Sequence, residues 1–83
     1  MNVTEALADR IRKADDKYGA PYSSHESLGV ITEEYHELVE AVRCNASSSI
    51  AEEALDIAAA CIRLAEACAG PFLVFQQRSG FVR

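Results

Sequence analysis

The sequence contains no tryptophan, one methionine and two prolines, and its 8 lysines and arginines are outnumbered by 13 acidic residues. A net charge of −5 disfavours duplex DNA or an anionic membrane surface as a partner, because both would repel the chain. No apolar run approaches the roughly 18 residues that a membrane span needs, and the N-terminus lacks the basic and apolar regions of a signal peptide. These absences predict a cytoplasmic protein that binds neither nucleic acid nor membranes.

Cysteine is scarce, and its spacing excludes the common structural uses of thiols. Cys44, Cys61 and Cys68 form an odd set without CxxC spacing, and two of them lie in an apolar helical run. We therefore expect buried free thiols rather than disulfides or zinc ligands.

The composition is that of one small folded domain. Apolar residues make up 49% of the 83 positions and charged residues 25%, which is far from the composition of disordered chains. A chain of this length supports one core at most, and that core is thin. We therefore treat residues 1–83 as a single domain and expect self-association.

Apolar periodicity predicts helices over about 3–18, 24–44 and 50–69. A capping box precedes each helix, formed by Asn2 with Glu5, Ser23 with Glu26 and Ser49 with Glu52. Gly19 with Pro21, and later Gly70 with Pro71, end the first and third patterns. Gly29, inside the second helix, indicates a close backbone approach or a later start of the regular helix.

The apolar positions of the three helices predict an all-α fold with short antiparallel connections. The third helix has apolar residues over more than half its circumference and is expected to be the most buried. The expected core-facing stripes are Val3, Leu7, Ile11, Ala14 and Tyr18; Leu28, Ile31, Tyr35, Leu38 and Val42; and Ile50, Ala51, Ala54, Ile57, Ala58, Cys61, Leu64, Ala65 and Cys68. Residues 70–83 fit either a short helical turn or an arm packed on a partner.

Two pairs of acids occupy equivalent positions on the second and third helices. Glu34 and Glu37 lie three residues apart between the apolar residues Val30 and Ala41, and Glu53 and Asp56 have the same spacing. A short turn at 45–48 makes the helices antiparallel neighbours, which brings the two pairs opposite each other. Four converging carboxylates are the hard oxygen ligands that Mg²⁺ or Mn²⁺ prefers.

Solvated glutamates on two amphipathic helices are the alternative explanation of this pattern. Neither pair has a Lys or Arg four residues further along its helix, so a cation from solution is the simplest neutraliser of the crowded charge.

The run Glu33-Glu34-Tyr35-His36-Glu37, fifteen residues, and then Glu53-Ala54-Leu55-Asp56 resembles the EExxE…ExxD motif of the MazG-like all-α nucleoside triphosphate pyrophosphohydrolases. The resemblance covers roughly residues 25–69 and includes the spacing between the two halves. It implies that Mg²⁺ is held by Glu34, Glu37, Glu53 and Asp56. Glu33 would be an additional acid that acts through water or as a base, which makes Glu33 and Glu37 the expected catalytic residues.

The resemblance further implies hydrolysis of a ribo- or deoxynucleoside triphosphate to the monophosphate and pyrophosphate, in the removal of unwanted nucleotides. Substrate contacts are expected from other polar and aromatic side chains, namely Arg63, Lys13, Lys17, Tyr18 and His25. Arg63 has an alternative role as a surface residue paired with Glu66 or Glu52, and Tyr18 as a core residue.

The chain departs from the family in lacking a clear fourth helix after Gly70 and any tryptophan for base stacking. Members of the family complete their bundles across an interface, so the resemblance implies a homodimer or homotetramer. Two other functions remain open. One is a helical dimerisation or adaptor module with solvated acids, and the other is a relative that binds metal and nucleotide without turnover.

Overall fold

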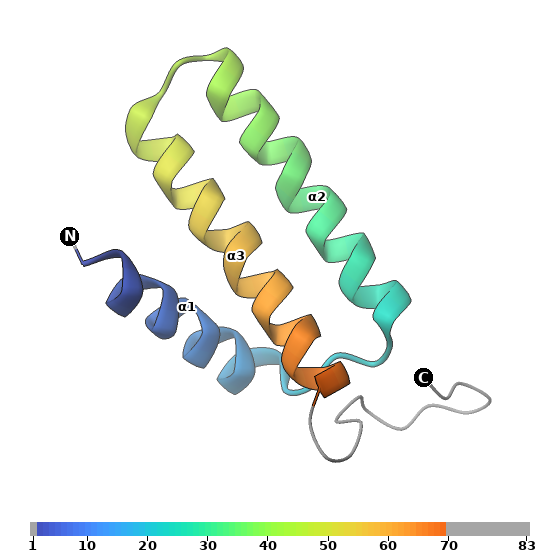
Figure 1. The fold of residues 1–83 in the computed structure, drawn as a ribbon. Helices are drawn as coiled ribbons and strands as arrows, with labels where there is room; N and C mark the ends of the chain where they lie inside the picture. Colours follow the sequence, from blue (N-terminus) through green and yellow to red (C-terminus); the bar gives the residue numbers. More distant parts are fainter. Residues whose placement is uncertain (1, 70–83) are drawn as a thin grey trace.

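The computed structural model describes residues 2–69, and these form three α-helices and no strand. The helices are α1 (Val3–Tyr18), α2 (Ser24–Arg43) and α3 (Ser47–Ala69) (Figure 1). The all-α class is therefore confirmed, and the predicted bounds of the first two helices hold to within one residue. The tail at 70–83, for which the sequence left two structures open, lies outside the described residues.

The starts of α1 and α2 are capped as the sequence predicts. The Asn2 side chain accepts a hydrogen bond from the Glu5 backbone N–H at 3.1 Å, and the Ser23 hydroxyl accepts one from the Glu26 N–H at 3.1 Å. Each bond satisfies a backbone donor that has no partner inside its helix. The Glu26 carboxylate accepts from the Tyr22 N–H at 3.0 Å, which fixes the approach to α2.

The start of α3 differs from the prediction, because Ser49 lies inside the helix and does not cap it. Asn45 takes the left-handed backbone conformation, with φ of 55°, and reverses the chain directly after α2. Asparagine adopts this conformation more readily than most residues. The Ile50 N–H then donates to the Ala46 carbonyl at 2.9 Å, so helical bonding begins before the predicted cap.

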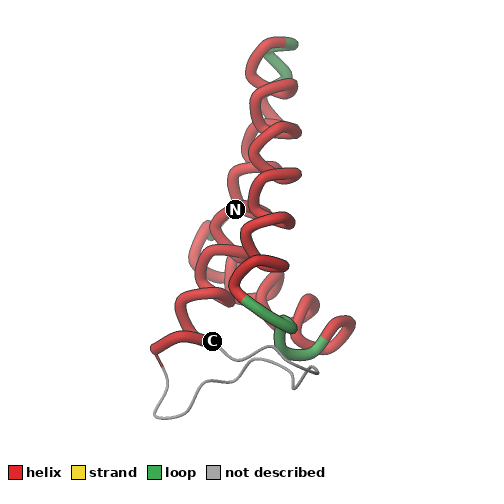
Figure 2. The backbone as a smooth tube through the Cα atoms, turned by 90° about the vertical axis from the view of Figure 1, so that its right-hand side faces the viewer, coloured by secondary structure: helices red, strands yellow, loops and turns green. Residues whose placement is uncertain are grey.

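The third helix lies between the other two (Figure 1). Among the described elements, α1 and α2 each pack on α3 but not on each other. Figure 2 shows the α2–α3 hairpin from the side, with its short connection at the tip. Residues of all three helices line one cleft.

Most buried apolar residues lie on α3, as predicted. They are, however, not the residues of the apolar stripe that the sequence predicts for this helix. The buried apolar residues of the described chain are Leu55, Ala59 and Ala67 on α3 and Ala41 on α2. The reason is that α1 docks on the side of α3 that carries Glu52 and Asp56, where Arg10 forms ion pairs with both. Five residues of the predicted stripe remain exposed, namely Ala51, Ala54, Cys61, Ala65 and Cys68.

The predicted core stripe of α2 is also only partly buried. Leu28, Tyr35 and Val42 are 58%, 56% and 55% exposed. They recur every seven residues on the flank of α2 turned away from the acids. We call these three residues the outer apolar face.

The prediction of buried cysteines is wrong, because Cys44, Cys61 and Cys68 are exposed, although all are free as expected. Cys61 and Cys68 lie on the side of α3 that α1 leaves uncovered. The interpretations of Gly29 are also wrong. The regular helix begins at Ser24, and a Cβ at Gly29 would meet no described atom within 4 Å.

The described helices include none that is both long enough and apolar enough to cross a membrane.

Candidate metal centre

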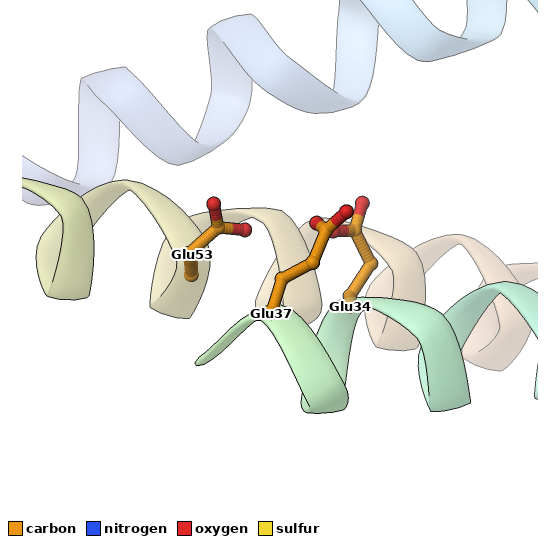
Figure 3. Close-up of side chains that lie close together, drawn as sticks. All are labelled: Glu34, Glu37 and Glu53. Carbon is orange, nitrogen blue, oxygen red and sulfur yellow. The ribbon is translucent and has the colours of Figure 1, made fainter. Parts of the chain in front are cut away.

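Three of the four predicted metal ligands meet in the structure. Glu34 and Glu37 project from neighbouring turns of α2 and Glu53 from α3, with one carboxylate oxygen of each within 4.8 Å of the others. Figure 3 shows all three carboxylates extending to the side of the hairpin on which α1 lies. The i, i+3 spacing on α2 and the antiparallel register of the hairpin produce this convergence, as the sequence predicts.

The crowding changes how these acids hold protons. Burial, a hydrogen bond with Glu37 and the charges of Asp56, Glu37 and Glu53 raise the pKa of Glu34 from 4.5 to about 7. Burial and the charge of Glu37 also raise the pKa of Glu53. Both effects disfavour the ionised carboxylate, and a positive charge placed among the three oxygens would relieve them.

The residues present fit a hard divalent cation. Glu53 Oε1 is shielded from solvent and has no hydrogen-bond partner among the described residues. A buried polar atom normally has a partner, so an orphaned carboxylate oxygen facing two other carboxylates is suited to metal coordination. Within the described chain no Lys or Arg forms an ion pair with Glu34, Glu37 or Glu53.

Asp56, the fourth predicted ligand, has a different partner. Arg10 Nε donates to Asp56 Oδ1 at 2.8 Å, and the same guanidinium pairs with Glu52. The expectation that a cation from solution is the simplest neutraliser of both acid pairs therefore does not hold for Asp56, which pairs with Arg10. An arginine of α1 lies against two acids of α3, and hydrogen bonding to Asp56 raises the pKa of Arg10.

Sequence reasoning missed Arg10, which is not among the predicted site residues. Its partners are 42 and 46 residues away, so no local spacing indicates them. One signal was available. Arg10 falls three residues after Leu7 and one before Ile11, inside the half-buried stripe of α1. A charged residue within an apolar stripe needs a partner on the helix that covers it.

A cleft of about 550 Å³ lies beside the acids, between α1 and α2. Its α1 wall is basic, with Arg10, Lys13 and Lys17, and its α2 wall includes Glu33 and Glu34. The small side chains of Ala59 and Ala60 form part of its lining on α3. The volume lies within the range of about 300–1,000 Å³ that small-molecule sites occupy.

Most predicted substrate-contact residues line this cleft, and each has a described neighbour. Lys13 pairs with Asp9 at 3.0 Å, and the Lys17 ammonium lies 5.1 Å from the centre of the Tyr18 ring. Tyr18 is 63% exposed, so its alternative role as a core residue is wrong. His25 lies in the first turn of α2 and is not among the residues that line the cleft.

Arg63 lines the cleft and also joins two helices. Its Nε donates to Asp15 Oδ1 at 2.8 Å, and its guanidinium donates to the Gly19 carbonyl. The predicted alternative partners, Glu66 and Glu52, are therefore not the ones it uses. Arg63 anchors the end of α1 on α3 at the edge of the cleft.

Comparisons of the chain with protein-family models, with curated proteins and with solved structures find no match.

Proposed function

We propose that this protein is a divalent-cation-dependent nucleoside triphosphate pyrophosphohydrolase, of the MazG-like kind that its motif resembles. The observation that carries the proposal is the convergence of Glu34, Glu37 and Glu53 beside a cleft with a basic opposite wall. A polyanionic substrate cannot approach three carboxylates directly, so a cation must lie between them. The basic wall then suits the phosphate groups that extend from that cation.

The cation would be Mg²⁺, or Mn²⁺, held by Glu34, Glu37 and Glu53 with Asp56 as the fourth ligand. When bound, such an ion neutralises phosphate oxygens and lowers the pKa of a water molecule. Glu33 lines the same cleft next to Glu34 and is suited to accept the proton of the attacking water. In this proposal four acids bind the cation, and Glu33 transfers the proton.

Phosphate binding falls to the α1 side of the cleft. Lys13 and Lys17 line it from adjacent turns of α1, about 6 Å apart along the helix by its regular rise. Lysine ammonium groups bind phosphate as point charges without fixed geometry. Tyr18 offers an exposed ring at the same end, where a base can stack.

The direct test is pyrophosphate release from a panel of ribo- and deoxynucleoside triphosphates, with and without Mg²⁺. We expect release to require Mg²⁺ and to fall by at least about a hundredfold in Glu37→Ala, because loss of a ligand weakens the cation site. His36→Ala is the matched control, since His36 neighbours Glu37 in sequence but is exposed and lies outside the acid cluster.

Each other outcome points to a different function. Release that is unaffected in Glu37→Ala, or that needs no metal, contradicts the site assignment. Metal binding without release across the panel indicates a relative that binds without turnover. Neither binding nor release indicates a helical dimerisation module.

The dimerisation module is a second candidate because one observation favours it. The outer apolar face exposes large side chains on a chain whose buried core consists mainly of alanines. Assembly through this face is also compatible with the enzyme, since the face lies on the flank of α2 away from the acids. We therefore propose that the chain forms a homodimer or homotetramer in either case.

A further inference from the structure

We propose that Arg10 competes with the divalent cation for Asp56, and that cation binding transfers its guanidinium to a phosphate group of the ligand in the cleft. This inference rests on the proposed function, because it concerns the same cation site. It adds a residue that the motif does not contain, and it couples cation binding to phosphate binding.

The competition follows from the contacts of Asp56. Its Oδ1 accepts from Arg10 Nε at 2.8 Å, while Glu34, Glu37 and Glu53 form the acid cluster without it. A carboxylate that binds a guanidinium has less negative charge to offer a metal. A divalent cation on Asp56 would also lie close to the arginine and repel it. Cation binding through Asp56 therefore weakens the ion pair with Arg10.

The released guanidinium can turn into the cleft. Arg10 lines the cleft together with Lys13 and Lys17, and its side chain is 22% exposed. Its other partner, Glu52, is 55% exposed, so solvent competes with that ion pair. An arginine that turns into the cleft can form paired hydrogen bonds with phosphate oxygens, which lysine cannot do.

The consequence is reciprocal coupling between the two ligands. A phosphate group that draws Arg10 away from Asp56 strengthens cation binding, and a cation on Asp56 strengthens phosphate binding by the same factor. This coupling would disfavour binding of the cation without the phosphate group, and of the phosphate group without the cation.

The test measures Mn²⁺ affinity by calorimetry in the wild type and in Arg10→Gln. Removing the competitor should tighten Mn²⁺ binding by about threefold to tenfold, the range expected for a partly exposed charged hydrogen bond. Arg12→Gln is the matched control, because it removes the same charge from α1 at a residue paired with Asp9. We expect its affinity to stay within about twofold of the wild type.

Asp56→Asn provides the specific check. In that background Arg10→Gln should no longer tighten Mn²⁺ binding, because the competition acts through Asp56. At saturating Mn²⁺, inorganic tripolyphosphate should bind Arg10→Gln about threefold to tenfold more weakly than the wild type. Circular dichroism checks that each variant folds. If Arg10→Gln loses its helical signal, the neutral variant Arg10→Met replaces it, with the same directions expected.

Equal or weaker Mn²⁺ binding in the Arg10 variant overturns the proposal while leaving the cation site intact. The same applies if the gain persists with Asn at position 56, or if tripolyphosphate binding is unchanged. Absence of Mn²⁺ binding in the wild type overturns the proposed function and this inference together.

Discussion

At the scale of single residues, the candidate site brings carboxylates close enough together for their charges to repel. Glu34 lies between Glu37, Glu53 and Asp56, and nothing in the described chain neutralises it. Its raised pKa means that the folded chain holds a proton on Glu34 more tightly than the unfolded chain does. The contribution of Glu34 to stability is therefore fully present below about pH 4.5 and is lost as the pH rises through about 7.

The first prediction concerns Glu34→Gln, which removes the charge and keeps the shape. At pH 8 and without metal, the variant should be more stable than the wild type by about 1–2 kcal/mol, a value reduced for solvent screening. Near pH 4.5 the difference should vanish, since Glu34 is then protonated in the folded wild type. Thermal unfolding followed by circular dichroism across this pH range measures both. Glu40→Gln, which removes the same charge from an exposed position of α2 outside the acid cluster, is the matched control.

Mn²⁺ binding at Glu34 should strengthen as the pH rises, whereas the contribution of Glu34 to stability decreases. A proton on Glu34 competes with a metal ion, so Mn²⁺ affinity should fall as the pH is lowered through about 7. In Glu34→Gln this pH dependence should be lost together with much of the affinity. Calorimetry in two buffers of different ionisation enthalpy would count the proton released. Affinity that is flat between pH 6 and pH 8 would contradict the raised pKa.

At the scale of helices, the sequence predicted what depends on neighbours in the chain. The starts of α1 and α2 follow from Asn2 and Ser23, whose side chains reach donors three residues away. The convergence of Glu34, Glu37 and Glu53 follows from helical spacing and a short connection.

What sequence reasoning could not predict depends on which face α1 covers. Pairing of Arg10 with Asp56 places α1 on the acidic side of α3, and that contact joins residues 46 positions apart. The predicted stripes followed the most apolar faces of the helices and gave no indication of which face α1 covers. Within the described chain Tyr35 and Cys61 remain exposed.

Two serines distinguish a true helix cap from an apparent one. Ser23→Ala should destabilise the protein by about 1 kcal/mol, because the Glu26 N–H loses its acceptor in a buried position. Ser49→Ala is the matched control and should change stability by less than about 0.5 kcal/mol, since Ser49 is exposed inside α3. Urea unfolding of the two variants provides the comparison. Equal losses would place a cap at Ser49 after all.

At the scale of the whole molecule, one side of the hairpin is charged and the other is apolar. The acid cluster and the cleft lie on the α1 side, while Leu28, Tyr35 and Val42 lie on the far flank of α2. Apolar side chains this large and this regularly spaced are typical of a surface that packs against another helix.

The oligomer is tested by placing a charge on the outer apolar face. We expect light scattering to show a dimer or tetramer for the wild type and a smaller species for Tyr35→Glu at the same concentration, because burying a glutamate is unfavourable. Ala8→Glu adds the same charge at an exposed position of α1 and should leave the assembly unchanged. A wild type that is monomeric at all concentrations would refute assembly through this face.

The central position of α3 also has a consequence for biosynthesis. Both α1 and α2 are translated before α3, yet within the described chain neither has any other helix to pack against. During translation, α1 and α2 therefore have no tertiary partner until α3 has been synthesised. In many other proteins, folding begins with the N-terminal part of the chain. Here, tertiary packing of α1 and of α2 can begin only as α3 leaves the exit tunnel.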